Sequence, residues 1–95
     1  MEKQFIVVAY DISDDRRRER LHQLLEGYGY PVQYSVFECR LKPPEIEKMK
    51  KAVRRTIRRS LDQVRYYYLC GACVRRIEVE GVGAEEAKEA EAIVV

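Results

Sequence analysis

The hydrophobic pattern of the chain begins with a continuous apolar run, Phe5 to Tyr10, which predicts a central strand that is buried on both faces. Asp11 ends this run. The polar residues Ser13 to Asp15 then predict the start of a helix, because a side-chain oxygen at the N-cap and carboxylates in the first turn favour a helix N-terminus. Leucines recur at helical spacing after them, so we expect an amphipathic helix over about residues 14–27, which glycines end.

A stretch rich in β-branched and aromatic residues follows from Val32 to Leu41. It is long for one strand, so we expect a kink or a split into two short strands. Two prolines then favour the start of a second helix, predicted over about residues 44–60 with apolar residues on one side. Two further strands are predicted, from Val64 to Cys70 and from Val74 to Glu80, around a turn at Gly71.

The order of these elements predicts the fold class. If the stretch before the second helix splits, the first six elements form the ferredoxin-like βαββαβ pattern of an α+β protein, with both helices on one face of the sheet. Several strands also carry apolar residues on the opposite face, which favours a symmetric homodimer. Residues 1–81 would form this domain. Residues 82–95 would form an acidic linker and an additional C-terminal strand that pairs with the other protomer, since Ile93 to Val95 is apolar.

Charge is distributed unevenly along the chain. Lys and Arg outnumber Asp and Glu by 18 to 16, a net charge of +2. Residues 1–80 hold 17 basic and 12 acidic side chains, and residues 81–95 hold one Lys and four Glu. Ninety-five residues exclude a second domain and a large multi-substrate enzyme. The first apolar run is too short for a signal peptide or a membrane span, so we expect a cytoplasmic protein with no membrane partner.

Two basic clusters predict a polyanionic partner. Four arginines crowd the first turns of the first helix, and seven positive charges with no acid lie within residues 48–59. Like charges four residues apart on a helix repel, and nothing inside the helix offsets this repulsion. We therefore expect contacts with a nucleic-acid backbone, although a merely solubilising surface is the alternative. The residues predicted to bind nucleic acid are Arg16, Arg17, Lys50, Lys51, Arg54, Arg55, Arg58 and Arg59.

Asp11 is the candidate metal ligand, because it stands where the central strand ends. A carboxylate is a hard oxygen ligand that suits Mg²⁺ or Mn²⁺. The alternative is a solvated acid that only ends the strand, and Asp14 and Asp15 fit the helix start better than a metal site. One carboxylate is too few for a complete set of protein ligands around a metal ion, but a residue near a two-fold axis occurs twice in a symmetric dimer.

For the cysteines we favour a structural role over a chemical one. The three cysteines are an odd number, which argues against a disulfide framework. A redox role for the Cys70-x-x-Cys73 spacing would require a helix after the motif, whereas we expect a strand. A zinc site needs four ligands, and the only candidates are Cys39, Cys70, Cys73 and His22. We therefore favour the interpretation that Cys70 and Cys73 are small residues in a hairpin.

The three tyrosines of the predicted strand at Tyr66 to Tyr68 alternate between its two faces. They could stack on bases, but packing in the core or at a dimer face is favoured. His22 is the only histidine, and we expect it on the helix surface without a catalytic partner.

Several short motifs, in a fixed order and spacing, resemble the CRISPR-associated protein 2 family, the small partner in spacer acquisition. The likeness spans about residues 4–81. The residues that carry it are Tyr10-Asp11-Ile12, Asp14-Asp15, the arginines that follow, Gln33, Ser35-Val36-Phe37-Glu38, Arg65-Tyr66-Tyr67 and Leu69-Cys70. This chain departs from some relatives at Tyr30-Pro31-Val32, where those relatives carry a basic residue.

The resemblance implies a ferredoxin-like homodimer in which Asp11 of both protomers faces a shared cleft that binds Mg²⁺. It implies a role in antiviral defence as a metal-dependent endonuclease acting on RNA or double-stranded DNA. The alternative that it leaves open is a non-catalytic DNA-binding dimer that bridges integrase subunits and holds the new spacer. Tyr10, Arg18, Arg20 and Phe37 match positions linked to activity in some relatives. A small-ligand sensor on the same fold would not explain the basic stretch.

Overall fold

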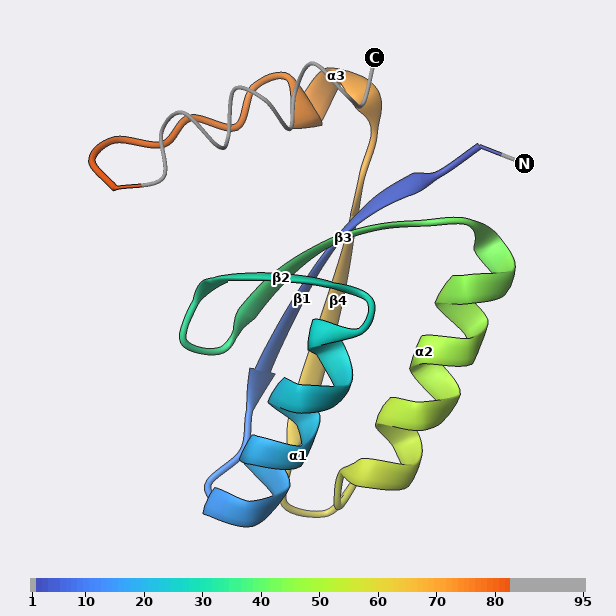
Figure 1. Cartoon of the computed structure of the whole chain (residues 1–95), viewed down its shortest axis with the longest axis vertical. Helices are drawn as coiled ribbons and strands as arrows, with labels where there is room; N and C mark the ends of the chain where they lie inside the picture. Colours follow the sequence, from blue (N-terminus) through green and yellow to red (C-terminus); the bar gives the residue numbers. More distant parts are fainter. Residues whose placement is uncertain (1, 83–95) are drawn as a thin grey trace.

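The computed structural model describes residues 2–82, and four strands in it form one antiparallel sheet in the order β2-β3-β1-β4. Helices α1 and α2 lie on one face of this sheet, and the short helix α3 follows β4 (Figure 1). The predicted ferredoxin-like α+β fold is confirmed. The elements are β1 (Gln4–Asp11), α1 (Asp15–Glu26), β2 (Gly29–Gln33), β3 (Val36–Leu41), α2 (Pro43–Thr56), β4 (Gln63–Leu69) and α3 (Gly71–Val74).

Strand β1 lies between β3 and β4, as its apolar run predicts. Its residues Ile6, Val8 and Tyr10 are buried toward the helices, because alternate side chains of a strand point to the same face. The helices complete the core with Leu21 and Leu25 of α1 and with apolar residues of α2. Burial of these side chains is the main force that holds both helices on the sheet.

Helix α1 begins and ends close to the predicted residues. The Asp14 carboxylate caps it by accepting a hydrogen bond from the backbone N–H of Arg17 at 2.9 Å. At the other end the N–H of Gly27 donates to the carbonyl oxygens of Leu24 and Leu25. The residue types at both ends therefore define the helix.

The predicted split of the third segment is also confirmed, with Tyr34 and Ser35 between β2 and β3. Strand β2 starts earlier than predicted, at Gly29. A Cβ atom on Gly29 would lie 2.3 Å from the carbonyl oxygen of Glu38 and 2.6 Å from Cys39 Sγ. Gly29 thus allows β2 to approach β3, in addition to following the end of α1.

Two expected element boundaries are wrong. Helix α2 ends at Thr56 and not near residue 60, because Ile57 adopts an extended conformation. The strand predicted from Val74 to Glu80 is absent from the described part of the chain, because Val74 ends α3 and residues 75–80 form a turn and an irregular segment. The N–H of Val74 donates to the carbonyl of Cys70 and that of Ile77 to Val74, so this segment coils. The apolar spacing of Val74 and Ile77 suits such turns.

The predicted acidic linker and C-terminal strand fall largely on residues 83–95, outside the described residues, so both stay predictions. No helix within residues 2–82 is long and apolar enough to cross a membrane.

Candidate functional site

The carboxylate of Asp11 is exposed at the end of the central strand. Tyr10 points toward the helices, so alternation directs Asp11 to the open face of the sheet, opposite Gln63 in the register of β1 and β4. Within residues 2–82, no hydrogen bond or ion pair engages this carboxylate. It is therefore free to bind a cation.

The described residues hold no group of three or more His, Cys, Asp or Glu side chains that could bind a metal ion together. A lone exposed carboxylate such as Asp11 fits Mg²⁺, which keeps several water ligands and needs only one or two carboxylates. It does not fit zinc, which requires a closed set of protein ligands. The donor chemistry thus agrees with the expected cation, provided that further ligands come from water or from a second copy.

Tyr10 and Phe37, which the resemblance links to activity, lie on the opposite face from Asp11, in the core. Tyr10 donates a hydrogen bond to the carbonyl of Tyr34 at 3.2 Å, and burial raises the pKa of its hydroxyl. Phe37 has no exposed surface, and its ring packs 6.4 Å from that of Tyr10. These two side chains hold the end of β1 and the β2–β3 turn in place. Their parts in activity stay predictions.

His22 lies on the surface of α1, as predicted, and is half-buried there. Its ring meets that of Phe37 edge-on at 5.1 Å, and its Nδ1 lies 3.4 Å from the hydroxyl of Tyr10. Sequence reasoning did not predict these contacts, although His22 follows the buried Leu21 and therefore lies beside the apolar side of α1. His22, Tyr10 and Arg18 border an open groove of about 620 Å³.

Arg18 stabilises the loop that follows Asp11. Its guanidinium donates to the carbonyl of Ile12 at 2.9 Å and forms an ion pair with Asp15. Arg16 and Arg20 are exposed, and neither pairs with an acid among the described residues. The structure therefore places Arg18 at the loop after β1, and leaves Arg16 and Arg20 without an acidic partner among residues 2–82.

Arg17 is bound differently, because it contacts the buried carboxylate of Asp62. Its Nε lies 2.8 Å from Asp62 Oδ2 and its Nη2 lies 3.0 Å from Asp62 Oδ1. The N–H of Arg58 also donates to Asp62 at 2.8 Å, and these contacts, with Arg17 first, lower the pKa of the Asp62 carboxyl. A phosphate would have to compete with this pair, so the predicted role of Arg17 in nucleic-acid binding stays a prediction.

Sequence reasoning missed Asp62. Its partner Arg17 is 45 residues away, and neither local pattern nor spacing indicates a contact over that separation. The bidentate geometry joins the start of α1 to the loop before β4.

Among the cations of residues 48–59, some are exposed and one contacts other side chains. Lys51, Arg54 and Arg55 are exposed on α2. Arg58 and Arg59 are exposed in the loop that follows, so the expected helical repulsion between them and the residues four positions earlier does not apply.

Lys50 is half-buried, and its Nζ lies 5.3 Å from the ring centre of Tyr66 and donates to the hydroxyl of Tyr68 at 3.3 Å. Tyr67 contacts Arg65 on the other face of β4, as the alternation predicts. Burial raises the pKa of Tyr66 to about 12, which agrees with the favoured packing role.

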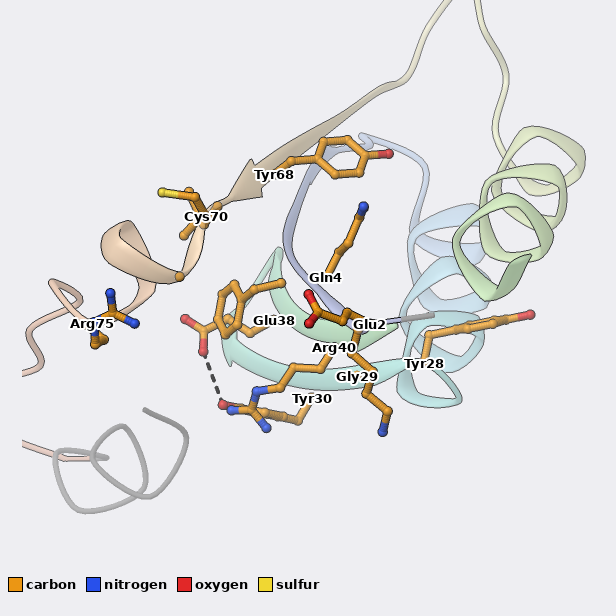
Figure 2. A pocket seen from close by; sticks show the side chains of 14 residues that line it. Glu2, Gln4, Tyr28, Gly29, Tyr30, Glu38, Arg40, Tyr68, Cys70 and Arg75 are labelled. Carbon is orange, nitrogen blue, oxygen red and sulfur yellow. Dashed lines mark hydrogen bonds between the residues drawn. The ribbon is translucent and has the colours of Figure 1, made fainter. Parts of the chain in front are cut away.

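The open face of the sheet carries a groove of about 1060 Å³ at the end away from Asp11 (Figure 2). Tyr30 donates to Glu38 across its floor at 3.1 Å. The Arg40 guanidinium lies 5.7 Å from the ring centre of Phe5. Two of its nitrogens, Nε and Nη2, are buried and have no hydrogen-bond partner among residues 2–82. Such donors are unfavourable unless another group supplies acceptors.

The three cysteines and His22 do not come together as zinc ligands within residues 2–82. Cys39 is buried in the core, where burial raises its pKa to about 11. Cys70 and Cys73 are exposed free thiols whose sulfurs lie 3.4 Å apart. The pair lies at the N-terminus of the short helix α3 and no strand follows it within residues 2–82, so the reason for disfavouring redox chemistry is wrong.

Comparison with known proteins gives consistent results. The family model of the CRISPR associated protein Cas2 matches residues 4–77. The chain is 44% identical over 75 residues to CRISPR-associated endoribonuclease Cas2 3 of Synechocystis sp., an alignment that covers 79% of this chain and 82% of that protein. It is 43% identical over 83 residues to CRISPR-associated endonuclease Cas2 2 of Thermus thermophilus, with 87% and 88% covered.

Solved structures agree with these relatives. The chain superposes on Streptococcus pyogenes Cas2 with a TM-score of 0.73 at 32% identity, covering 81% of this chain and 99% of the other. It also superposes on a chain of a partial Cas6-RT-Cas1–Cas2 complex with a TM-score of 0.68 at 26% identity, covering 85% and 92%.

Proposed function

Because the chain belongs to the CRISPR associated protein Cas2 family, we propose that it serves CRISPR spacer acquisition as a metal-dependent endonuclease that hydrolyses phosphodiester bonds of RNA or double-stranded DNA. The observation that carries this proposal is the exposed, unpaired carboxylate of Asp11 at the end of the central strand. Relatives named endoribonuclease and endonuclease support both kinds of substrate.

Asp11 of two copies would hold Mg²⁺ or Mn²⁺. When bound, the ion would supply positive charge to a phosphodiester and lower the pKa of a coordinated water. Arg18 fixes the loop after Asp11 through the carbonyl of Ile12, and so positions the carboxylate. The exposed guanidinium groups of Arg16 and Arg20 are available to a phosphate, which arginine binds in a bidentate manner.

We also propose a symmetric homodimer that covers the open sheet face. Val7 and Leu69 place half-buried apolar side chains on that face, opposite the helices. A two-fold axis would present Asp11 twice, which a one-carboxylate site requires.

The second candidate function is a non-catalytic dimer that holds DNA and bridges integrase subunits. The solved complex that contains Cas1 and Cas2 supports an integrase partner. In this case the exposed cations Lys51, Arg54 and Arg55 of α2 would contact the backbone without reading sequence. We also propose the cytoplasm as the location for either function, because the three free thiols fit a reducing compartment.

Substitution of Asp11 separates the two functions. Asp11→Asn removes the charge of the carboxylate with little change of shape, and Asp14→Asn is the matched control because Asn also caps helices well. We expect Asp11→Asn to lower Mg²⁺-dependent cleavage of RNA and duplex DNA by at least about 100-fold. Asp14→Asn should retain activity, and a chelator should abolish it in both active proteins.

Equal cleavage by wild type and Asp11→Asn would refute the proposed metal site. If neither protein cleaves while both bind duplex DNA equally, the structural function is the correct one. The binding assay thus distinguishes an inactive site from a misfolded variant.

A further inference from the structure

Cys70 and Cys73 form a pair of thiols that the proposed function does not use. Cys70 stands at the end of β4 as the N-cap of α3, and Cys73 lies one helical turn later. Their sulfur atoms are 3.4 Å apart, within hydrogen-bond distance for sulfur. A disulfide has an S–S distance of about 2.0 Å, so a small rotation of the side chains would bring the sulfurs to bonding distance.

Both thiols are accessible within the described structure, whereas the third one is not. Cys70 and Cys73 are exposed, and Cys70 and Arg75 border the groove at the end of the sheet away from Asp11 (Figure 2). Cys39 has 1% of its surface exposed. A reagent in solution can therefore distinguish the pair from the single buried cysteine.

The surroundings of Cys70 favour its thiolate, which is the reactive form of the side chain. The backbone N–H of Cys73 and then the Cys73 thiol itself stabilise the charged sulfur, so the pKa of Cys70 lies below its ordinary value. The same contact raises the pKa of Cys73. The 3.4 Å separation of the two sulfurs allows either thiol, once it has reacted, to be resolved by the other.

We propose that Cys70 and Cys73 are a site of reversible oxidation that exchanges with a small-molecule disulfide such as glutathione disulfide. The Cys70 thiolate attacks one sulfur of the reagent, whose S–S bond breaks and releases one glutathione thiolate. Cys73 then loses its proton and attacks Cys70 Sγ, which forms the Cys70–Cys73 bond and releases the second glutathione. Two electrons pass from the protein dithiol to the reagent, and the two thiol protons leave with the glutathione products.

The experiment treats the reduced full-length chain with glutathione disulfide at neutral pH and follows its intact mass. We expect a product that is lighter by two hydrogen atoms, with the bond mapped by peptide mass to Cys70 and Cys73. Added dithiol should reverse the change. Cys39→Ser is the matched control and should behave as the wild type, since its thiol is buried.

Single substitutions of the pair test the order of attack. In Cys73→Ser the mixed disulfide on Cys70 should accumulate with the mass of one added glutathione, because no second thiol resolves it. In Cys70→Ser the remaining Cys73 should react roughly ten-fold more slowly, because its thiol lacks the stabilised charge. Both positions are exposed, so serine should leave the fold intact, as far-UV circular dichroism would verify.

Three outcomes would overturn the proposal. The first is a chain that carries two glutathiones and no internal disulfide, and the second is a disulfide that includes Cys39. The third is a pair that resists oxidation because it holds Zn²⁺ shared between two chains, which mass spectrometry under native conditions would show as one ion per dimer. The nuclease activity of Asp11→Asn plays no part in this test, so the proposed function can fail independently.

Discussion

Asp62 shows how tertiary structure lowers the pKa of an ionisable group. Its buried carboxylate receives hydrogen bonds from the guanidinium of Arg17 and the backbone N–H of Arg58. A charge without water requires such partners, and here they join α1 to the loop before β4. The ion pair of Arg17 and Asp62 therefore helps to hold the arginines of α1 and those of the loop before β4 in fixed positions.

The lowered pKa of Asp62 predicts how stability depends on pH. In the unfolded chain an Asp has a pKa of about 3.9, so the ionised group stabilises the fold above that value. This contribution is lost as the pH falls through the lower pKa of the folded state. The difference in unfolding free energy between wild type and Asp62→Asn should therefore be large at pH 7 and shrink near pH 3. Urea unfolding at both pH values measures it, and an equal difference would refute the proposed ion pair.

Gly29 gives a second test at the scale of one residue. Gly29→Ala places a Cβ atom 2.3 Å from the carbonyl oxygen of Glu38. The backbone of β3 cannot easily move to relieve this clash. We expect a loss of about 1–3 kcal/mol in the free energy of unfolding. Gly71→Ala is the control, since its Cβ would meet only the Arg75 guanidinium at 3.4 Å. Equal stability of the two variants would show that β2 does not approach β3 this closely.

At the scale of elements, α2 combines a buried apolar side with an exposed basic side. Ile46, Met49 and Val53 pack in the core, while Lys51 and Arg54 face solvent. Lys50 differs because its ammonium group contacts two tyrosines. The helix is thus held by its apolar side, which leaves the exposed charges available for a polyanion.

The exposed cations of α2 predict the salt dependence of nucleic-acid binding. Replacing Lys51, Arg54 and Arg55 together by Gln should reduce the slope of log affinity against log salt by up to about three, roughly one for each lost phosphate contact. Lys50→Gln should reduce it less, because Tyr66 and Tyr68 already engage that side chain. Fluorescence anisotropy with a labelled duplex measures both slopes. An unchanged slope in the triple variant would exclude α2 as the contact surface.

The elements that local sequence determines were predicted well, and those that depend on distant contacts were not. The apolar run of β1 and the cap at Asp14 define their elements within a few residues. The segment after Gly71 fits both a strand and a turn by its apolar spacing, and hydrogen bonds to Cys70 and Val74 make it coil. We predicted that α2 ends near residue 60, four residues too late, because the charged residues 58 and 59 suit a helix as well as a loop.

The same distinction applies to the candidate site. The exposure of Asp11 follows from its place after an apolar strand. The positions of His22 and Asp62 depend on the packing of α1 against Phe37 and on a long-range ion pair, which one sequence does not reveal.

At the scale of the whole molecule, the proposed function requires two chains. One chain offers a free carboxylate at Asp11 and an open sheet face. A symmetric pair would double the carboxylate and cover the face. The dimer and the metal site are therefore a single hypothesis with two parts.

Cleavage by mixed dimers tests that hypothesis most directly. Wild type is held at a fixed concentration while an equal amount of Asp11→Asn is added and the chains are allowed to exchange, with Asp14→Asn added in a parallel control. Random pairing puts about half of the wild-type chains into mixed dimers, so Mg²⁺-dependent cleavage should fall to about half if both Asp11 carboxylates share the ion. The control should show no loss. Cleavage that is unchanged by added Asp11→Asn, in chains shown by mass to have exchanged, would contradict a metal site shared by two protomers.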